Sequence, residues 1–236
     1  MNPCLLAIDT STERMALALT WPGGTLTRVE AGAAASSARL LPLAQELLQQ
    51  AGLAFAQLDA IAFGRGPGAF TGLRTACAVA QGLAYAHGRP VLPLDSLMLV
   101  AEDATTQAPV DGLIWVAMDA RMDEVYAAAY QPGQDGWQVA VAPALYTLPA
   151  LAARWQALPP ATVAGSAVAA FGERLPLAAA HLVPAERDRA AALATLARRA
   201  WAAGRGVPPE QALPLYLRDK VALTTDERAR VAAAKA

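Results

Sequence analysis

The sequence predicts an α/β protein in which one arrangement of strands and helices occurs twice. Residues 5–94 give the order β-β-β-α-β-α-β, and residues 113–164 repeat its β-β-β-α-β part. In both halves the first apolar strand ends in an aspartate before a hairpin, at Asp9 and at Asp119. The recurring order and the paired aspartates together indicate a duplicated unit.

Strands and helices of the first half follow from short apolar runs, turn residues and helical periodicity. Pro22-Gly23-Gly24 marks a turn between two strands, and Gly52 follows a helix as a C′ residue. Strands are expected at 5–8, 15–20, 25–31, 60–63 and 91–94, and helices from Ser36 or Ser37 to 51, over 73–86 and from Ser96.

The second half begins again after residues 107–109, so two domains are predicted, 1–106 and 107–236. The first would be an N-terminal domain that carries the partner-binding helices, and the second a C-terminal domain with a tail. Its strands are expected at 113–118, 125–130, 138–141 and 162–164, and its helices at 148–158 and 192–203. Residues 224–236 are expected to form a final amphipathic helix or a frayed tail.

Composition narrows the class of protein. The hydrophobic content of 55% and the net charge of −1 describe a globular chain that can bury a core, without the basic excess of an autonomous nucleic-acid binder.

Cys4 and Cys77 lie in apolar runs, which indicates buried free thiols in a reducing compartment. Residues 1–3 carry no positive charge, and Asp9 breaks the first apolar run. A cytoplasmic protein without a membrane segment is therefore expected.

A glycine-rich turn, residues 64–74, joins a predicted strand to a predicted helix. Such a turn meets either a phosphate or another stretch of backbone. It is no P-loop, because Leu73 stands where the lysine should be. Gly64, Gly66 and Ala69 satisfy a dinucleotide fingerprint, but the next acidic residue is Asp95, too far away to bind the ribose. A dehydrogenase is therefore only a distant alternative.

Four segments together resemble the TsaB (YeaZ) family, the dimerisation subunit of the bacterial complex that makes threonylcarbamoyladenosine in tRNA. They are Asp9-Thr10-Ser11, the glycine-rich turn, residues 119–126 and Tyr216-Leu217-Arg218. The resemblance spans nearly the whole chain. It implies a duplicated actin-like, Hsp70-like ATPase (ASKHA) fold with two β-β-β-α-β-α type domains, and a role in tRNA modification.

The resemblance also implies a subunit without catalytic residues of its own. Catalytic relatives carry a His-x-x-x-His pair on a helix for a metal, and by the resemblance the two positions are Ser96 and Val100 here. The two histidines, His87 and His181, are isolated in the sequence. We therefore expect no catalytic, metal or intrinsic cofactor site, with ATP-Mg bound at most by the complex.

The sequence does not decide whether the chain itself binds a nucleotide, and two places in it are candidates. Asp9 could hold magnesium, or it could close the first hairpin as an Asx turn. In the second half only Gly165-Ser166 offers a glycine-containing loop. The alternative function is an ATP-dependent transferase or a metallo-glycopeptidase-like hydrolase of the same fold. Hydrolysis needs a nucleophile beside an oriented base, and the sequence suggests no Ser-His-Asp or Cys-His set.

Two helices offer apolar stripes that could bind a partner or cover the domain's own sheet. The resemblance favours a partner: the catalytic homologue TsaD in a heterodimer, or a second copy in a homodimer. A small P-loop ATPase, TsaE, and tRNA would join through the complex. The expected interface residues are Leu40, Leu43, Leu47, Ala76, Val79, Ala80 and Leu83.

Overall fold

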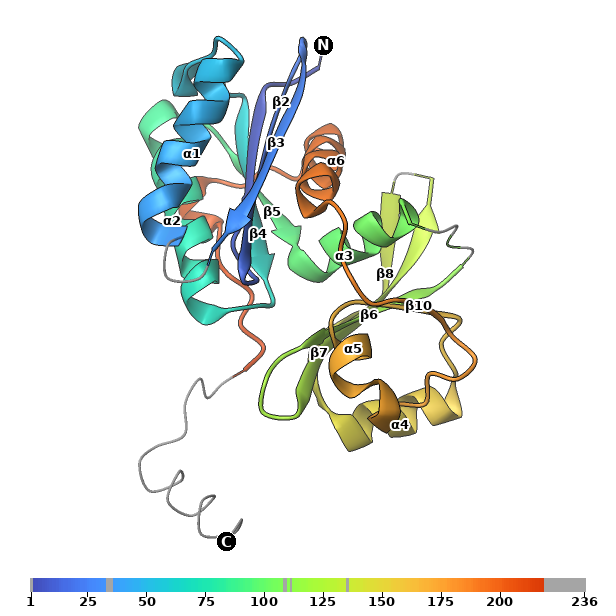
Figure 1. Ribbon diagram of the computed structural model, residues 1–236. Coiled ribbons are helices and arrows are strands. Elements are labelled where there is room, and N and C mark those ends of the chain that lie inside the picture. Colours follow the sequence, from blue (N-terminus) through green and yellow to red (C-terminus); the bar gives the residue numbers. More distant parts are fainter. Residues whose placement is uncertain (1, 33–35, 108–109, 111, 135, 219–236) are drawn as a thin grey trace, which may run out of the picture.

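The computed structural model describes residues 2–32, 36–107, 110, 112–134 and 136–218, and its strands form two five-stranded sheets (Figure 1). In the first sheet β1 pairs antiparallel with β2, which pairs antiparallel with β3, while β4 and β5 add in parallel on the other side. The order is β3 (Gly24–Ala31), β2 (Arg14–Trp21), β1 (Leu5–Asp9), β4 (Ala60–Gly66) and β5 (Val91–Asp95).

The second sheet repeats this topology strand for strand. Two antiparallel pairs are again followed by two parallel ones. Its order is β8 (Gly136–Thr147), β7 (Glu124–Gly133), β6 (Ile114–Asp119), β9 (Thr162–Ala164) and β10 (His181–Val183). The duplicated α/β fold predicted from the sequence is therefore confirmed.

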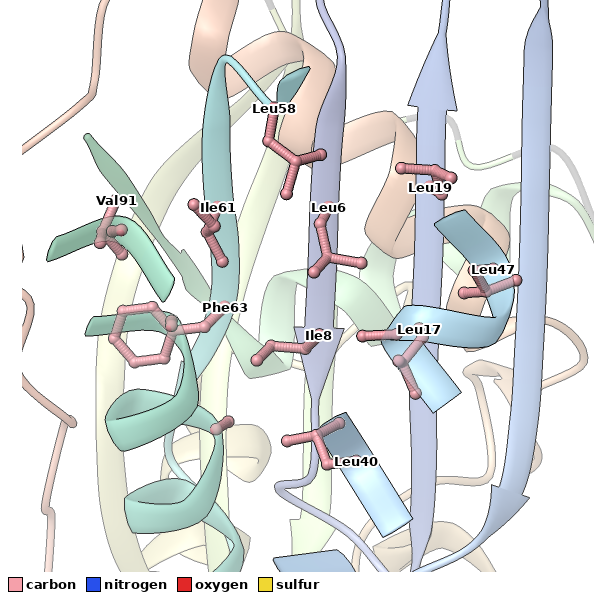
Figure 2. Close-up of a cluster of buried hydrophobic side chains, with 14 of the residues drawn as sticks. Leu6, Ile8, Leu17, Leu19, Leu40, Leu47, Leu58, Ile61, Phe63 and Val91 are labelled. Carbon is pink, nitrogen blue, oxygen red and sulfur yellow. The ribbon is translucent and has the colours of Figure 1, made fainter. Parts of the chain in front are cut away.

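One face of the first sheet is covered by α1 (Ser36–Gln50) and α2 (Phe70–His87). Side chains alternate along a strand, so Leu6 and Ile8 of β1 point toward these helices. Figure 2 shows the resulting core, with Leu40 and Leu47 of α1 directed at the strands. Helix α2 ends at Gly88, whose left-handed backbone (φ 60°) is the usual helix C-terminal conformation.

The third helix of each half packs on the sheet of the other half. Helix α6 (Arg189–Ala202) lies on the second face of the first sheet, where it forms a core with residues such as Leu5 and Ala7. Helix α3 (Ser96–Thr105) packs on the second sheet. The predicted C-terminal domain, 107–236, thus contains a helix whose core lies in the N-terminal half, although the boundary itself stays a prediction.

The outer face of the second sheet is covered by α4 (Leu148–Ala157) and α5 (Ala167–Phe171). The sequence did not predict the five-residue α5 or the three-residue β10, because elements this short carry little periodicity. Short 3₁₀ turns occupy Phe55–Gln57, Gly172–Arg174 and Pro209–Gln211. The helix expected over 224–236 lies outside the described residues. Among the described helices, none has the length and apolarity to cross a membrane.

Candidate functional site

A cleft of about 790 Å³ lies between the two halves, and the loops singled out in the sequence line it. Four segments of its wall come from the hairpin turns after β1 and β6, the glycine-rich turn and Gly165-Ser166. Residues 184–187, Arg189 and residues 215–218 also line it. Segments far apart in the sequence therefore meet at one site, as the duplicated topology requires.

The glycine-rich turn meets backbone rather than open space. The Ala69 amide donates to the Ser11 carbonyl oxygen at 2.7 Å, and Thr10 Oγ1 donates to the Gly72 carbonyl oxygen at 2.6 Å. A Cβ atom at Gly72 would overlap the Thr10 carbonyl oxygen. The β1–β2 turn therefore packs directly on the start of α2, and glycine is required where the two backbones touch.

Asp9 is fully buried at the base of the cleft, and both of its carboxylate oxygens are hydrogen-bonded. Oδ1 accepts from the Ser11 amide at 3.1 Å and from Ser11 Oγ at 2.8 Å, and Oδ2 accepts from Ser96 Oγ at 2.9 Å. Ser96 Oγ in turn accepts from the Gly66 amide at 3.0 Å. The contact from Ser11 is the Asx turn, the second of the two roles considered for Asp9.

Arg189 completes this cluster from the first turn of α6. Its Nε donates to Asp9 Oδ1 at 3.0 Å, Nη2 to Ser11 Oγ at 2.8 Å, and Nη1 to Glu186 Oε2 at 2.5 Å. The side chain is only 6% exposed. Burial alone would lower the pKa of Arg189, but the neighbouring Asp9 and Glu186 raise it above its usual value. An ion pair between Asp9 and Arg189 thus lies beneath the cleft, and of the two residues only Arg189 lines it.

Arg189 was not predicted from the sequence, although one signal for it was present. Arg189, Leu193 and Leu196 share one helical face at a spacing of four and three residues, and all three are buried. An arginine on the apolar stripe of a helix needs a buried partner. Its partner Asp9 lies 180 residues away, so the sequence alone could not identify it.

The residues around Asp9 do not fit a magnesium ion. Asp9 has no exposed surface, and magnesium would have to displace Arg189 from it. Ser96 is committed to Asp9, and Val100 lies in the core beneath the second sheet. Within the described ranges no three His, Cys, Asp or Glu side chains are grouped as metal ligands.

The thiols and histidines lie away from the cleft wall. Burial raises the pKa of both Cys4 and Cys77, the opposite of what an activated nucleophile requires. Cys77 Sγ instead donates to the Ala212 carbonyl oxygen at 3.1 Å. His87 stacks on Phe55 with ring centroids 6.3 Å apart, and His181 is exposed on β10.

Residues 215–218 form a strap across the mouth of the cleft. At one end the Leu215 amide donates to the Arg65 carbonyl oxygen at 2.6 Å, and the rings of Tyr216 and Phe70 are in tilted contact with centroids 5.3 Å apart. At the other end Arg218 Nη2 pairs with Glu124 Oε2 at 2.5 Å. The strap therefore ties the first half of the chain to the second.

Most of the predicted interface residues are not accessible to a partner. Five of the seven side chains are each no more than 1% exposed, because α1 and α2 turn them toward their own sheet. Figure 2 shows this orientation for Leu40 and Leu47. The small residues of α2 let it lie close to β4. The prediction is therefore wrong for Leu40, Leu43, Leu47, Ala76 and Ala80, and it stays a prediction for the partly buried Val79 and Leu83.

The opposite faces of the same helices are exposed. On α2, Ala78, Gly82 and Tyr85 follow one another at helical spacing, and Tyr85 is 83% exposed. On α1, Leu41 is 44% exposed. We call these four residues the α1–α2 outer surface. It combines small side chains with two large apolar ones, which suits close helix packing.

Comparison with known proteins places the chain in a family. The family model for TsaD, tRNA N6-adenosine threonylcarbamoyltransferase, matches residues 26–183. The TsaB protein of Escherichia coli, named for tRNA threonylcarbamoyladenosine biosynthesis, is 33% identical over 234 residues, which cover 92% of this chain and 96% of that protein. The chain belongs to the TsaB family. The resemblance to the TsaB family that the sequence motifs indicate is thereby confirmed.

Two further similarities agree with TsaB membership. The TsaB protein of Haemophilus influenzae is 42% identical over 125 residues, 53% of this chain, and the match spans about half the length of that relative (52%). The solved structure of YeaZ from Pseudomonas aeruginosa superposes with a TM-score of 0.80 at 42% identity, covering 91% of this chain and all of that one. TsaB relatives thus match both the sequence and the fold.

Proposed function

We propose that this chain is a non-catalytic assembly subunit in the biosynthesis of tRNA threonylcarbamoyladenosine. It would act beside a catalytic homologue of the TsaD type, which transfers the threonylcarbamoyl group to N6 of the adenosine next to the anticodon. Membership of the TsaB family supports the pathway. The chain itself would act in the cytoplasm. It would provide a binding surface for the catalytic subunit rather than catalytic residues.

The observation that carries the non-catalytic role is the buried pair of Asp9 and Arg189. A catalytic cleft of this fold needs open ligand positions for metal or nucleotide. Here Arg189 pairs with the carboxylate of Asp9 beneath the cleft, so that carboxylate is not open to a metal ion. Ser96 and Val100 stand at the two positions that the resemblance assigns to the histidine pair. These features support a chain without an intrinsic cofactor, in which any ATP-Mg would be bound by the assembled complex.

The α1–α2 outer surface supports an assembly role. Tyr85 offers a large aromatic side chain that could fill a pocket of the partner, and such anchors dominate binding energy at interfaces. Ala78 and Gly82 beside it leave room for a partner helix. We therefore assign the contact with the TsaD-type subunit to this surface. A homodimer through the same surface would compete with it. TsaE and tRNA would join the assembled complex.

Ala78→Glu tests this assignment. The new carboxylate would be buried without a partner in the complex, so we expect the affinity for the TsaD-type subunit to fall at least about tenfold. The monomer should keep its stability because residue 78 is exposed. Light scattering on the mixed proteins measures assembly, and reconstituted tRNA modification measures function.

Ala153→Glu, on the exposed face of α4, is the matched control and should assemble like the unmodified protein. A charge at Ala80 is unsuitable, because Ala80 is in the core and its replacement would unfold the monomer. Unchanged assembly of Ala78→Glu would remove α2 from the interface. Turnover of ATP by this chain alone would contradict the non-catalytic role.

A further inference from the structure

A second cavity, of about 350 Å³, lies on a different part of the molecule and shares no lining residue with the cleft. It is bounded by the edge strand β5, the second half of α6 and the start of β8. Its volume is within the range of small-molecule sites. The lining residues that matter here are Arg65, Asp95, Trp137, Arg199 and Arg205.

Guanidinium groups dominate the polar lining of this cavity. Arg199 is neutralised, since its Nη1 pairs with Glu102 Oε2 at 2.5 Å. The side chains of Arg65 and Arg205 donate to no acceptor among the residues that the structure describes. Two arginines with free donors thus line one cavity, and planar guanidinium groups bind phosphate or carboxylate oxygens in pairs.

Asp95, the remaining acid of the lining, is turned toward the protein. Its Oδ2 accepts from Tyr130 Oη at 2.7 Å, and its Oδ1 accepts from the Leu97 amide at 2.9 Å. Burial raises the pKa of Asp95, more than these hydrogen bonds and the nearby charge of Arg65 lower it. The Asp95 carboxylate accepts its hydrogen bonds from Tyr130 and Leu97, so Arg65 interacts with it only as a nearby charge and keeps its donors available to a ligand.

Trp137 gives the cavity a fixed aromatic wall. Its Nε1 donates to Glu102 Oε2 at 2.7 Å, and its ring meets the edge of Tyr130 with centroids 6.4 Å apart. The ring is partly exposed. Because Glu102 holds both Trp137 and Arg199, the indole and the charged rim keep a set position before any ligand arrives. A planar group can pack on such a ring.

We propose that this cavity binds a nucleoside 5′-phosphate, with the phosphate at Arg65 and Arg205 and the planar base against Trp137. The proposal does not depend on the assembly role, because the cavity includes none of the residues of the α1–α2 outer surface. Arg65 belongs to the glycine-rich turn, but it does not line the cleft as Pro67, Phe70 and Leu73 of that turn do. Its exposed side chain lines the second cavity, where it would bind the phosphate of the ligand.

Titration calorimetry with AMP on the full chain tests the proposal. We expect saturable one-to-one binding, which Arg65→Gln and Arg205→Gln each weaken about tenfold or more because each removes a charged donor pair. Both side chains lie at the rim, so the fold should be retained, as circular dichroism would check. Inorganic phosphate should bind more weakly than AMP, since it lacks the base.

Arg187→Gln is the matched control, because Arg187 is exposed and lines the large cleft instead. It should bind AMP like the unmodified protein. Three results would overturn the proposal: absence of saturable binding, loss of binding in Arg187→Gln with retention in Arg65→Gln, or equal affinity for AMP and inorganic phosphate.

Discussion

Arg189→Met should lower the free energy of unfolding by about 3–5 kcal/mol, because it leaves the carboxylate of Asp9 buried without its cation. Asp9 has no exposed surface through which water could replace the guanidinium group. Ser11 Oγ and Glu186 would each lose a hydrogen bond from the same side chain. Urea unfolding followed by circular dichroism measures the effect.

Two further variants separate the ion pair from the general effect of losing an arginine. Arg187→Met, two residues earlier and exposed, should change stability by no more than about 0.5 kcal/mol. Arg189→Lys should fall between the two, since it keeps the charge but cannot reach Asp9, Ser11 and Glu186 together. If Arg189→Met and Arg187→Met were equally stable, the buried cluster would contribute nothing to the fold.

Gly72→Ala should destabilise the protein by about 3 kcal/mol, the upper part of the range for overpacked sites. Gly72 is near the start of α2, where the β1–β2 turn crosses the helix. A methyl group there would collide with the Thr10 carbonyl oxygen, which is backbone and cannot move aside cheaply. Thermal unfolding of the purified variant measures the loss.

We expect the opposite effect on stability from Gly82→Ala, on the same helix. Residue 82 has open space around it, with no atom within 4 Å of an added Cβ. Alanine is favoured over glycine in a helix interior by about 1 kcal/mol, so this variant should be more stable than the unmodified protein. A stabilising effect of Gly72→Ala would mean that the turn and the helix are farther apart than described.

Patterning in the sequence predicted the duplicated order of elements because each strand carries its own apolar run and turn residues. The same patterning did not reveal which face of α1 and α2 turns inward. A stripe such as Leu40, Leu43 and Leu47 is equally compatible with a sheet of the same chain or with a partner helix. Only the placement of α2 on β4 shows that the small residues serve the chain's own packing.

The base of the cleft was predictable only in part. Asp9 and the glycine-rich turn attract notice because aspartate and glycine each have a specific role at the end of a strand. Arg189 and Ser96 join them through contacts that span 180 and 87 residues. Contacts of that separation depend on how two sheets and two helices pack, which local periodicity does not encode.

The exchanged positions of α3 and α6 make the two halves interdependent during folding. Each sheet has one apolar face covered by a helix that belongs to the other half of the sequence. A fragment cut at the predicted boundary would therefore expose an uncovered sheet, and such fragments aggregate rather than fold. We therefore expect the chain to unfold as one cooperative unit with two sheets, since neither half can complete its core before the other is in place.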